Sequence, residues 1–128
     1  MSLEKVYICS PLSAPTAEGI RRNMEAARWY MRLISQLWQC RAVAPHAYLP
    51  EFLDDTDGQE RELALSFGLA YLDTCDRLVI CGSRITRGML GEILHAAAKG
   101  IPIFWVQEGY PPLRNSINGI EYEEIQGW

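Results

Sequence analysis

The feature that most constrains the fold of this 128-residue chain is a regular alternation of short β-prone runs with longer helical segments. The β-prone runs are apolar over four or five residues and end near proline, serine or glycine, as buried strands do. We expect strands at 6–9, 41–44, 77–81 and 102–106, and a short final strand at 121–125.

Helical patterns fill the segments between these runs, at 17–37, 60–74 and 86–99. Apolar residues in the first segment recur at steps of three and four and form one stripe: Ile20, Met24, Ala27, Met31, Ile34 and Trp38. The second segment is apolar on two sides, which predicts deep burial or a subunit contact. We therefore expect a homodimer or higher homo-oligomer.

The order of these elements predicts an α/β fold. Strands without strict polar alternation, joined by helices, are typical of a parallel sheet with both faces covered. The sequence therefore predicts a three-layer fold with a parallel sheet of four or five strands, flavodoxin-like or Rossmann-like. The length fits one domain spanning 1–128.

Composition excludes several classes of function. The formal charge of −4 disfavours binding to nucleic acid, and the longest apolar stretch, 63–72, is too short to cross a membrane. The chain begins without a signal-peptide pattern, and its four cysteines form no C-x-x-C pair. We therefore expect a cytoplasmic protein with free thiols, no metal site, no cofactor and a small-molecule partner.

Two loops are the candidate ligand-binding segments, because ligands of open α/β sheets bind beyond the carboxyl ends of the strands. The first loop contains Ser10 and Pro11, and the second runs from 82 to 89 into a helix. The start of that helix offers unpaired N–H groups to an anion. The candidate residues in the second loop are Gly82, Ser83, Arg84, Thr86, Arg87, Gly88 and Met89. Alternatively, Thr86 is only a helix cap and the arginines are solvated.

Glu92 is the strongest single candidate for chemistry. Helical side chains tilt toward the N-terminus, so the carboxylate of Glu92 should lie over Gly88, where glycine leaves space for a ligand. A carboxylate among apolar neighbours near a helix N-terminus has the setting of a nucleophile or base. The alternative is an ordinary, half-exposed helix glutamate.

These residues resemble a known family. The first strand with Val6-Tyr7-Ile8, Asp76 before the third strand, and Thr86-x-Gly88-x-x-x-Glu92 are similar to the nucleoside 2-deoxyribosyltransferase superfamily. That superfamily includes the 2′-deoxynucleoside 5′-monophosphate N-glycosidases. The resemblance covers about residues 5 to 106 and is closest to a branch with a Ser-Pro after the first strand, a Pro-His pair and a Gly-Met-x-x-Glu helix start.

The resemblance implies roles for individual residues. Glu92 would attack the anomeric carbon of the sugar, and Tyr7 would orient its carboxylate by a hydrogen bond. Thr86 matches a position that is serine in the monophosphate glycosidases. With Arg84 and Arg87, it would bind a substrate phosphate. His46, in the loop after the second strand, would bond the base or the phosphate; the alternative is a histidine of the polar surface.

One departure leaves two functions open. The family has an aspartate eight residues before the position of Asp76, and this chain has Gly68 there. Another acid would have to protonate the leaving base, and the candidates are Asp54, Asp55 and Glu62. The sequence thus predicts an N-glycosidase or deoxyribosyltransferase acting on a nucleoside or its monophosphate. The alternative is a non-catalytic nucleotide-binding sensor or regulatory domain.

Overall fold

The computed structural model describes residues 3–54, 57–82, 84–108, 116–117 and 120–125. Asp55 and Ser83, both candidates from the sequence, lie outside the described residues. The helices are α1 (Ala17–Trp38), α2 (Gly58–Leu72) and α3 (Arg87–Ala98), with short 3-10 turns η1 (Pro45–Ala47) and η2 (Leu49–Glu51). The strands are β1 (Lys5–Cys9), β2 (Arg41–Val43), β3 (Arg77–Cys81), β4 (Ile103–Glu108), β5 (Ser116–Ile117) and β6 (Ile120–Ile125).

The strands form one sheet in the order β2-β1-β3-β4-β6-β5. The four predicted parallel strands are confirmed, since β1 pairs in parallel with β2 and β3, and β3 with β4. The predicted final strand is present as β6, but it runs antiparallel to β4, and β5 adds a sixth strand. A strand that follows β4 can run parallel to it only after a crossover segment, which is usually a helix. None of the described helices lies between β4 and β6 in the chain, which agrees with their antiparallel pairing.

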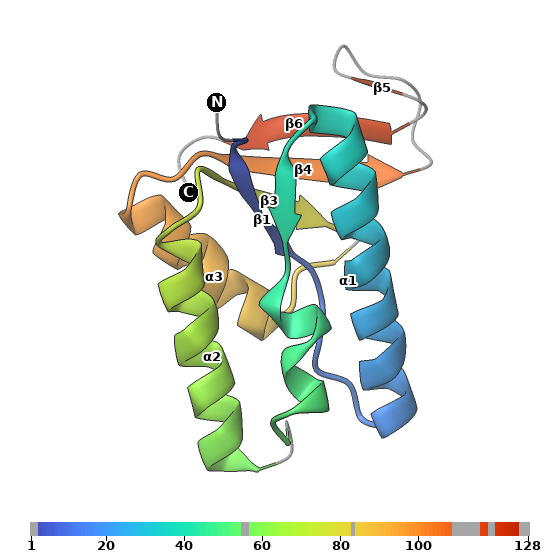
Figure 1. Cartoon of the computed structure of the whole chain (residues 1–128), viewed down its shortest axis with the longest axis vertical. Coiled ribbons are helices and arrows are strands. Elements are labelled where there is room, and N and C mark those ends of the chain that lie inside the picture. The colour runs from blue at the N-terminus through green and yellow to red at the C-terminus, as the bar shows by residue number, and fades with distance from the viewer. Residues whose placement is uncertain (1–2, 55–56, 83, 109–115, 118–119, 126–128) are drawn as a thin grey trace.

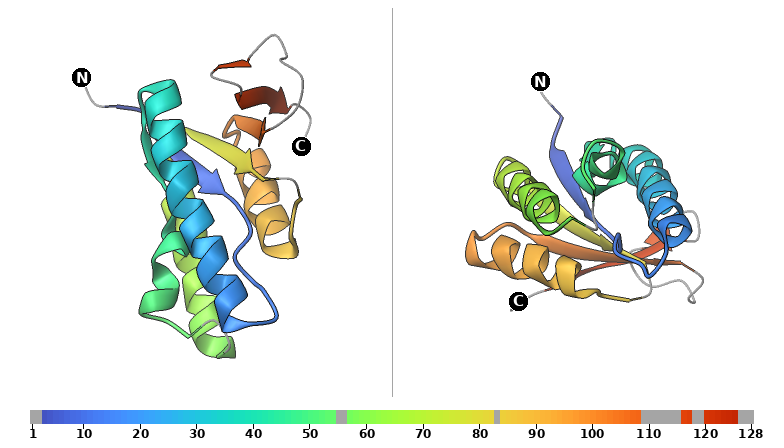
Figure 2. Two further views of the ribbon diagram at one scale, coloured as in Figure 1. Left: turned by 90° about the vertical axis from the view of Figure 1, so that its right-hand side faces the viewer. Right: turned by 90° about the horizontal axis from the view of Figure 1, so that it is seen from below.

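Helices cover both faces of the sheet, so the predicted three-layer architecture is confirmed (Figure 1). α1 packs on one face, while α2 and α3 lie together on the other (Figure 2). Alternate residues of β1 point to opposite faces, as in any strand. Val6 and Ile8 join the core beneath α1, and Tyr7 and Cys9 join the core beneath α3.

α1 begins and ends within one residue of its predicted bounds. Thr16 caps its start, because the hydroxyl accepts a hydrogen bond from the Gly19 backbone N–H at 3.0 Å. The predicted apolar stripe faces the sheet, with Met24, Ala27 and Ile34 buried. Among the described residues, no helix is both long enough and apolar enough to span a bilayer.

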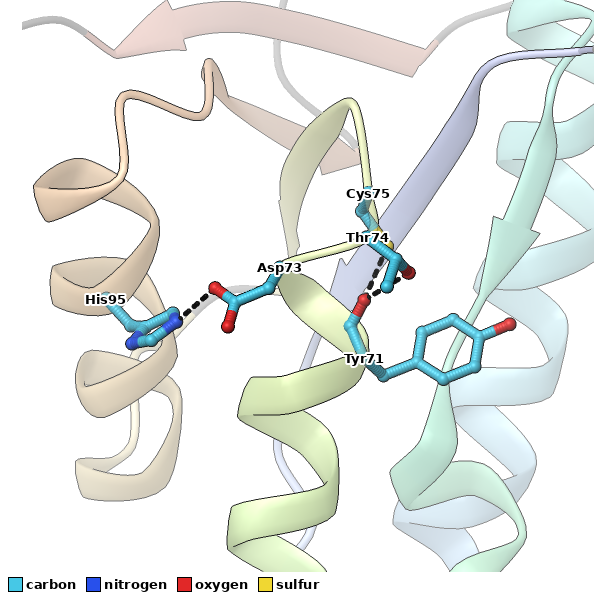
Figure 3. Close-up of polar contacts among 5 residues, drawn as sticks. All are labelled: Tyr71, Asp73, Thr74, Cys75 and His95. Atoms are coloured by element: carbon cyan, nitrogen blue, oxygen red, sulfur yellow. Dashed lines mark hydrogen bonds and ion pairs between the residues drawn. The ribbon is translucent and has the colours of Figure 1, made fainter.

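α2 and α3 are tied together near the end of α2. His95 of α3 and Asp73, just after α2, point toward each other, with 2.6 Å between Nε2 and Oδ1 (Figure 3). The Thr74 hydroxyl donates to the Tyr71 carbonyl at 2.6 Å and closes the last turn of α2. α2 leaves Leu63 and Phe67 exposed, so the homo-oligomer stays a prediction that this structure of one chain does not test.

The sheet order creates a topological switch point between β1 and β3. From β1 the chain crosses to β2 on one side, whereas from β3 it crosses to β4 on the other. Loops that diverge in this way leave a crevice at the carboxyl ends of the strands. The candidate loops after β1 and β3 leave the sheet at this point.

Candidate active site

A cavity of about 220 Å³ lies at this edge of the sheet, between α2, α3 and the η1–η2 segment. Its walls are largely apolar and are formed by Leu12, Leu49, Pro50, Leu53, Leu65 and Leu69. The polar side chains among its lining residues come from β1, α2, α3, η1 and the loop after β1: Tyr7, Ser13, His46, Glu60, Arg61 and Glu92. An apolar hollow with a few convergent polar groups is the usual form of a small-molecule site.

Glu92 projects from the second turn of α3 into this cavity and is half-buried. Burial raises the pKa of its carboxyl to about 7, while hydrogen bonds from Tyr7 and Cys9 act in the opposite direction. The Cys9 thiol lies 3.8 Å from Oε1. At Gly88, one turn earlier, an added Cβ would meet no other atom within 4 Å, so the space that glycine was expected to leave is open.

Tyr7 is buried on β1, and its hydroxyl and the Glu92 carboxyl each affect the pKa of the other. Burial, followed by the charge of Glu92 and the hydrogen bond with it, raises the pKa of the tyrosine well above its usual value. A Cβ added at Gly68 would lie 3.1 Å from the Tyr7 hydroxyl oxygen. Glycine at 68 therefore leaves this hydroxyl unobstructed, and a larger side chain there would press on it.

His46 lines the cavity from η1 and is held by Ser10. The buried Ser10 hydroxyl lies 2.7 Å from His46 Nε2, and the buried Nδ1 has no hydrogen-bond partner among the described residues. Burial lowers the pKa of His46 to about 4, so the imidazole is neutral near pH 7. It can therefore offer one N–H donor and one acceptor, which suits positioning of a ligand better than proton donation.

The predicted phosphate loop is only partly at the cavity. Thr86 is the helix cap of α3, accepting from the Met89 N–H at 3.3 Å, and Met89 is buried in the core. Arg84 and Arg87 are exposed. Of the described residues of this loop, Gly88 alone is among those that line the cavity.

Pro11 and Gly82 do not line the cavity either. Gly82 has a φ of +108°, which favours glycine, and an added Cβ there would lie 3.8 Å from a Pro11 carbon. The loops after β1 and β3 are therefore neighbours, as the sequence predicted, but these two residues meet beside the cavity.

The expected proton donors need correction. Asp54 and Glu62 do not line the cavity, and Glu62 is exposed on α2. The acid that α2 does bring to the cavity is Glu60, whose Oε2 accepts from the Asp54 backbone N–H at 3.1 Å. A helical step of four from Glu60 reaches Ala64 and then Gly68, both lining residues. The same periodicity could have identified Glu60 from the sequence.

Sequence reasoning also missed the roles of two residues at or beside the cavity, Arg61 and Cys9. Arg61 donates to the Ser13 hydroxyl at 2.8 Å and joins α2 to the loop after β1. Cys9, expected to be only a core thiol, contacts Glu92.

The four cysteines are free and buried, and within the described ranges no three His, Cys, Asp or Glu side chains gather as a metal site would require.

The cavity and most of the fold, from β1 into β4, lie in a segment that matches a protein family. Residues 4–106 match the model of a family described as a domain of unknown function, DUF7768. The chain belongs to the DUF7768 family. No curated protein matches this DUF7768 chain. All the lining residues, from Tyr7 to Glu92, fall within the DUF7768 segment.

This DUF7768 domain is similar in fold to a solved structure, the 2-deoxyribosyltransferase of the psychrotolerant bacterium Bacillus psychrosaccharolyticus. The TM-score is 0.53 and the sequence identity is 13%. The match covers 77% of this chain and 69% of the other. At this identity the likeness establishes a common fold, and a fold alone does not fix an activity.

The hydrogen bond from Tyr7 gives a first prediction for the DUF7768 domain. Because this bond favours the ionised form of Glu92, Tyr7→Phe should move the Glu92 pKa above about 7. Cys9→Ala should move it in the same direction but less, since a thiol is a weak donor. Carbon-detected NMR titration of the Glu92 carboxyl measures both shifts. A Glu92 pKa that stays constant or falls in Tyr7→Phe would contradict the contact.

Proposed function

We propose that this protein cleaves or exchanges the N-glycosidic bond of a nucleoside or nucleotide through a glutamyl-sugar intermediate. The observation that carries the proposal is Glu92, a carboxylate at the cavity wall that the Cys9 thiol contacts and whose pKa is lowered by the hydroxyl of the buried Tyr7 against the effect of burial. The common fold with a 2-deoxyribosyltransferase supports the same class of reaction.

In this proposal the two residues divide the first step between them. An ionised Glu92 oxygen bonds to the anomeric carbon as the bond to the base breaks, and Tyr7 keeps the carboxylate in one orientation. With a pKa of about 7, the reactive carboxylate becomes more abundant as the pH rises through neutrality. Water, or a second base, then takes the sugar from Glu92.

The remainder of the cavity supports binding of a heterocycle. Leucine side chains from η2 and α2 offer apolar surface to a flat ring, with Leu49 on one side and Leu65 and Leu69 on the other. His46 is fixed by Ser10 through Nε2, so its free Nδ1 can offer one hydrogen bond to the polar edge of the base, as donor or acceptor according to the tautomer.

We further propose that a substrate phosphate is bound at the start of α3. Gly88 lines the cavity and follows the Thr86 cap, so the unpaired N–H groups of the first turn lie next to the sugar site. Charge-assisted hydrogen bonds contribute on the order of 1.5–3 kcal/mol each. A nucleoside 5′-monophosphate should therefore bind at least about tenfold more tightly than its nucleoside.

Thr86→Asp tests the phosphate site without loss of the helix cap. Aspartate caps helices as well as threonine does, so α3 should form normally while the new carboxylate repels the phosphate. We expect the preference for the monophosphate to disappear in Thr86→Asp and to persist in the matched control Thr86→Ser. Calorimetry with a nucleoside and its monophosphate measures it, and equal affinity of the two ligands for the wild-type protein would refute the anion site.

Gly68 favours a second candidate function, a nucleotide-binding sensor or regulatory domain without catalysis. With glycine at position 68, this position places no carboxyl group beside Tyr7, and neither Glu62 nor Asp54 lines the cavity. Release of free base from deoxynucleosides and their monophosphates, followed by chromatography, separates the two functions. Tight binding without base release would favour the sensor and contradict the enzyme.

A further inference from the structure

The charges around the cavity carry an inference about its ligand. Among the described residues that line it, Glu60 and Glu92 are acidic and Arg61 is basic. Arg61 already donates to Ser13. With both carboxylates ionised, these three side chains sum to one negative charge, so a bound cation is favoured over a bound anion inside the cavity itself.

Glu92 in particular has neutral partners. The donors that reach its carboxylate are the Tyr7 hydroxyl and the Cys9 thiol, and the walls opposite are leucine and proline. In such surroundings an ionised carboxylate gains most from a ligand that brings a positive charge within a few ångströms.

The groups that could protonate a leaving base are engaged or are weak acids. Glu60 accepts the Asp54 backbone N–H. His46 is bonded through Nε2 to Ser10, and burial lowers its pKa to about 4, so near pH 7 it has no imidazolium proton to give. Tyr7 is hydrogen-bonded to Glu92. A neutral base needs a proton as it leaves, because its ring nitrogen keeps the electron pair of the broken bond. A base that is cationic beforehand does not.

We propose that the heterocycle bound opposite Glu92 carries a positive charge in its ring before it is released, as in N-glycosides of pyridinium rings or of N7-alkylated purines. This inference rests on the proposed function and names its substrate class. The apolar walls accept the body of the ring, and the Glu92 carboxylate faces its charge.

The reaction then balances without an acid. A Glu92 oxygen forms a bond to the anomeric carbon while the carbon–nitrogen bond breaks. The electron pair of that bond passes to the ring, which loses its positive charge and leaves as a neutral molecule. Water next attacks the anomeric carbon, the ester bond to Glu92 breaks, and one proton goes to solvent as the carboxylate returns.

Pairs of ligands that differ in charge test the inference. One pair is 1-ribosylpyridinium-3-carboxamide and its neutral 1,4-dihydro form, and the other is 7-methyladenosine and adenosine, each in the ribose and 2′-deoxyribose series. At about pH 8, above the Glu92 pKa of about 7, we expect the cationic member to bind at least about tenfold more tightly by calorimetry. Glu92→Gln should remove this preference, whereas Glu62→Gln, an exposed α2 carboxylate outside the cavity, should keep it.

Base release from the same pairs separates this inference from the proposed function. Faster release from the cationic members, relative to their spontaneous hydrolysis, supports both. Glu92-dependent release from neutral nucleosides that bind as tightly as cationic ones overturns the inference and leaves the proposed function intact. A cation preference without release from any pair supports the charge assignment and contradicts the proposed function. Failure of every pair to bind overturns the inference.

Discussion

Glu92→Gln should reduce base release by at least about 10³-fold while leaving the affinity for a neutral nucleoside within a few-fold of wild type. Glutamine keeps the size of the side chain and can still meet the Tyr7 hydroxyl, but its amide oxygen is a poor nucleophile toward the anomeric carbon. Chromatography of the released base gives the rate, and calorimetry gives the affinity for the intact nucleoside.

The matched control for this experiment is Glu62→Gln. Glu62 lies on α2, is exposed and does not line the cavity, so its loss removes the same charge from the chain without touching the site. Its rate of base release should equal that of wild type. Release that survives Glu92→Gln at near wild-type rate would remove Glu92 from the mechanism.

Glu92→Gln should also stabilise the folded protein above neutral pH. Burial moves the Glu92 pKa from the usual value of 4.5 to about 7, so the folded state resists its ionisation. A pKa shift of this size corresponds to a loss on the order of 2–3 kcal/mol in the free energy of unfolding when Glu92 is ionised, once the partial exposure of Glu92 is taken into account. The neutral glutamine avoids that penalty.

The sign of this effect fixes its pH window. Between about pH 4.5 and 7 the unfolded chain loses the Glu92 proton before the folded chain does, so wild-type stability falls as the pH rises through this range. The difference between Glu92→Gln and wild type should therefore be small below about pH 4.5 and largest above about pH 7. Urea unfolding of both proteins at a series of pH values measures it. A stability difference that is independent of pH would show that Glu92 is not destabilised by burial.

Much of the fold could be predicted because its pattern is local. Residues 6–9 and 78–81 are apolar throughout, and only a sheet covered on both faces buries such runs completely. The stripe on α1 fixes which side of that helix meets the sheet. The antiparallel direction of β6 and the additional strand β5 could not be predicted in this way, because strand direction there depends on the path of the chain and not on the residues in the strand.

The centre of the candidate site could also be predicted, because it depends on the local spacing of residues. Gly88 and Glu92 are one helical turn apart, so the space beneath the carboxylate follows from helix geometry. Tyr7 shares a strand with core residues whose alternation places it on the side of α3.

Other parts of the site depend on tertiary contacts. The Ser10–His46 pair joins residues 36 positions apart, and the contact of Cys9 with Glu92 spans 83. No spacing in the sequence encodes either. Glu60 and Glu62 are two residues apart on α2 and so point to nearly opposite sides of the helix, which brings Glu60 to the cavity and leaves Glu62 exposed.

The most direct test of the central claim is to trap the sugar on Glu92. A nucleoside with fluorine at the 2′ carbon of its sugar should form the glycosyl ester and release its base, yet hydrolyse slowly, because the electron-withdrawing fluorine disfavours the oxocarbenium-like transition state of the second step. Intact-protein mass spectrometry should show the mass of one fluorosugar added, and peptide fragmentation should place it on Glu92, with no addition in Glu92→Gln. Base release from such a nucleoside with an unmodified protein mass, or a sugar attached to any other residue, would contradict the account.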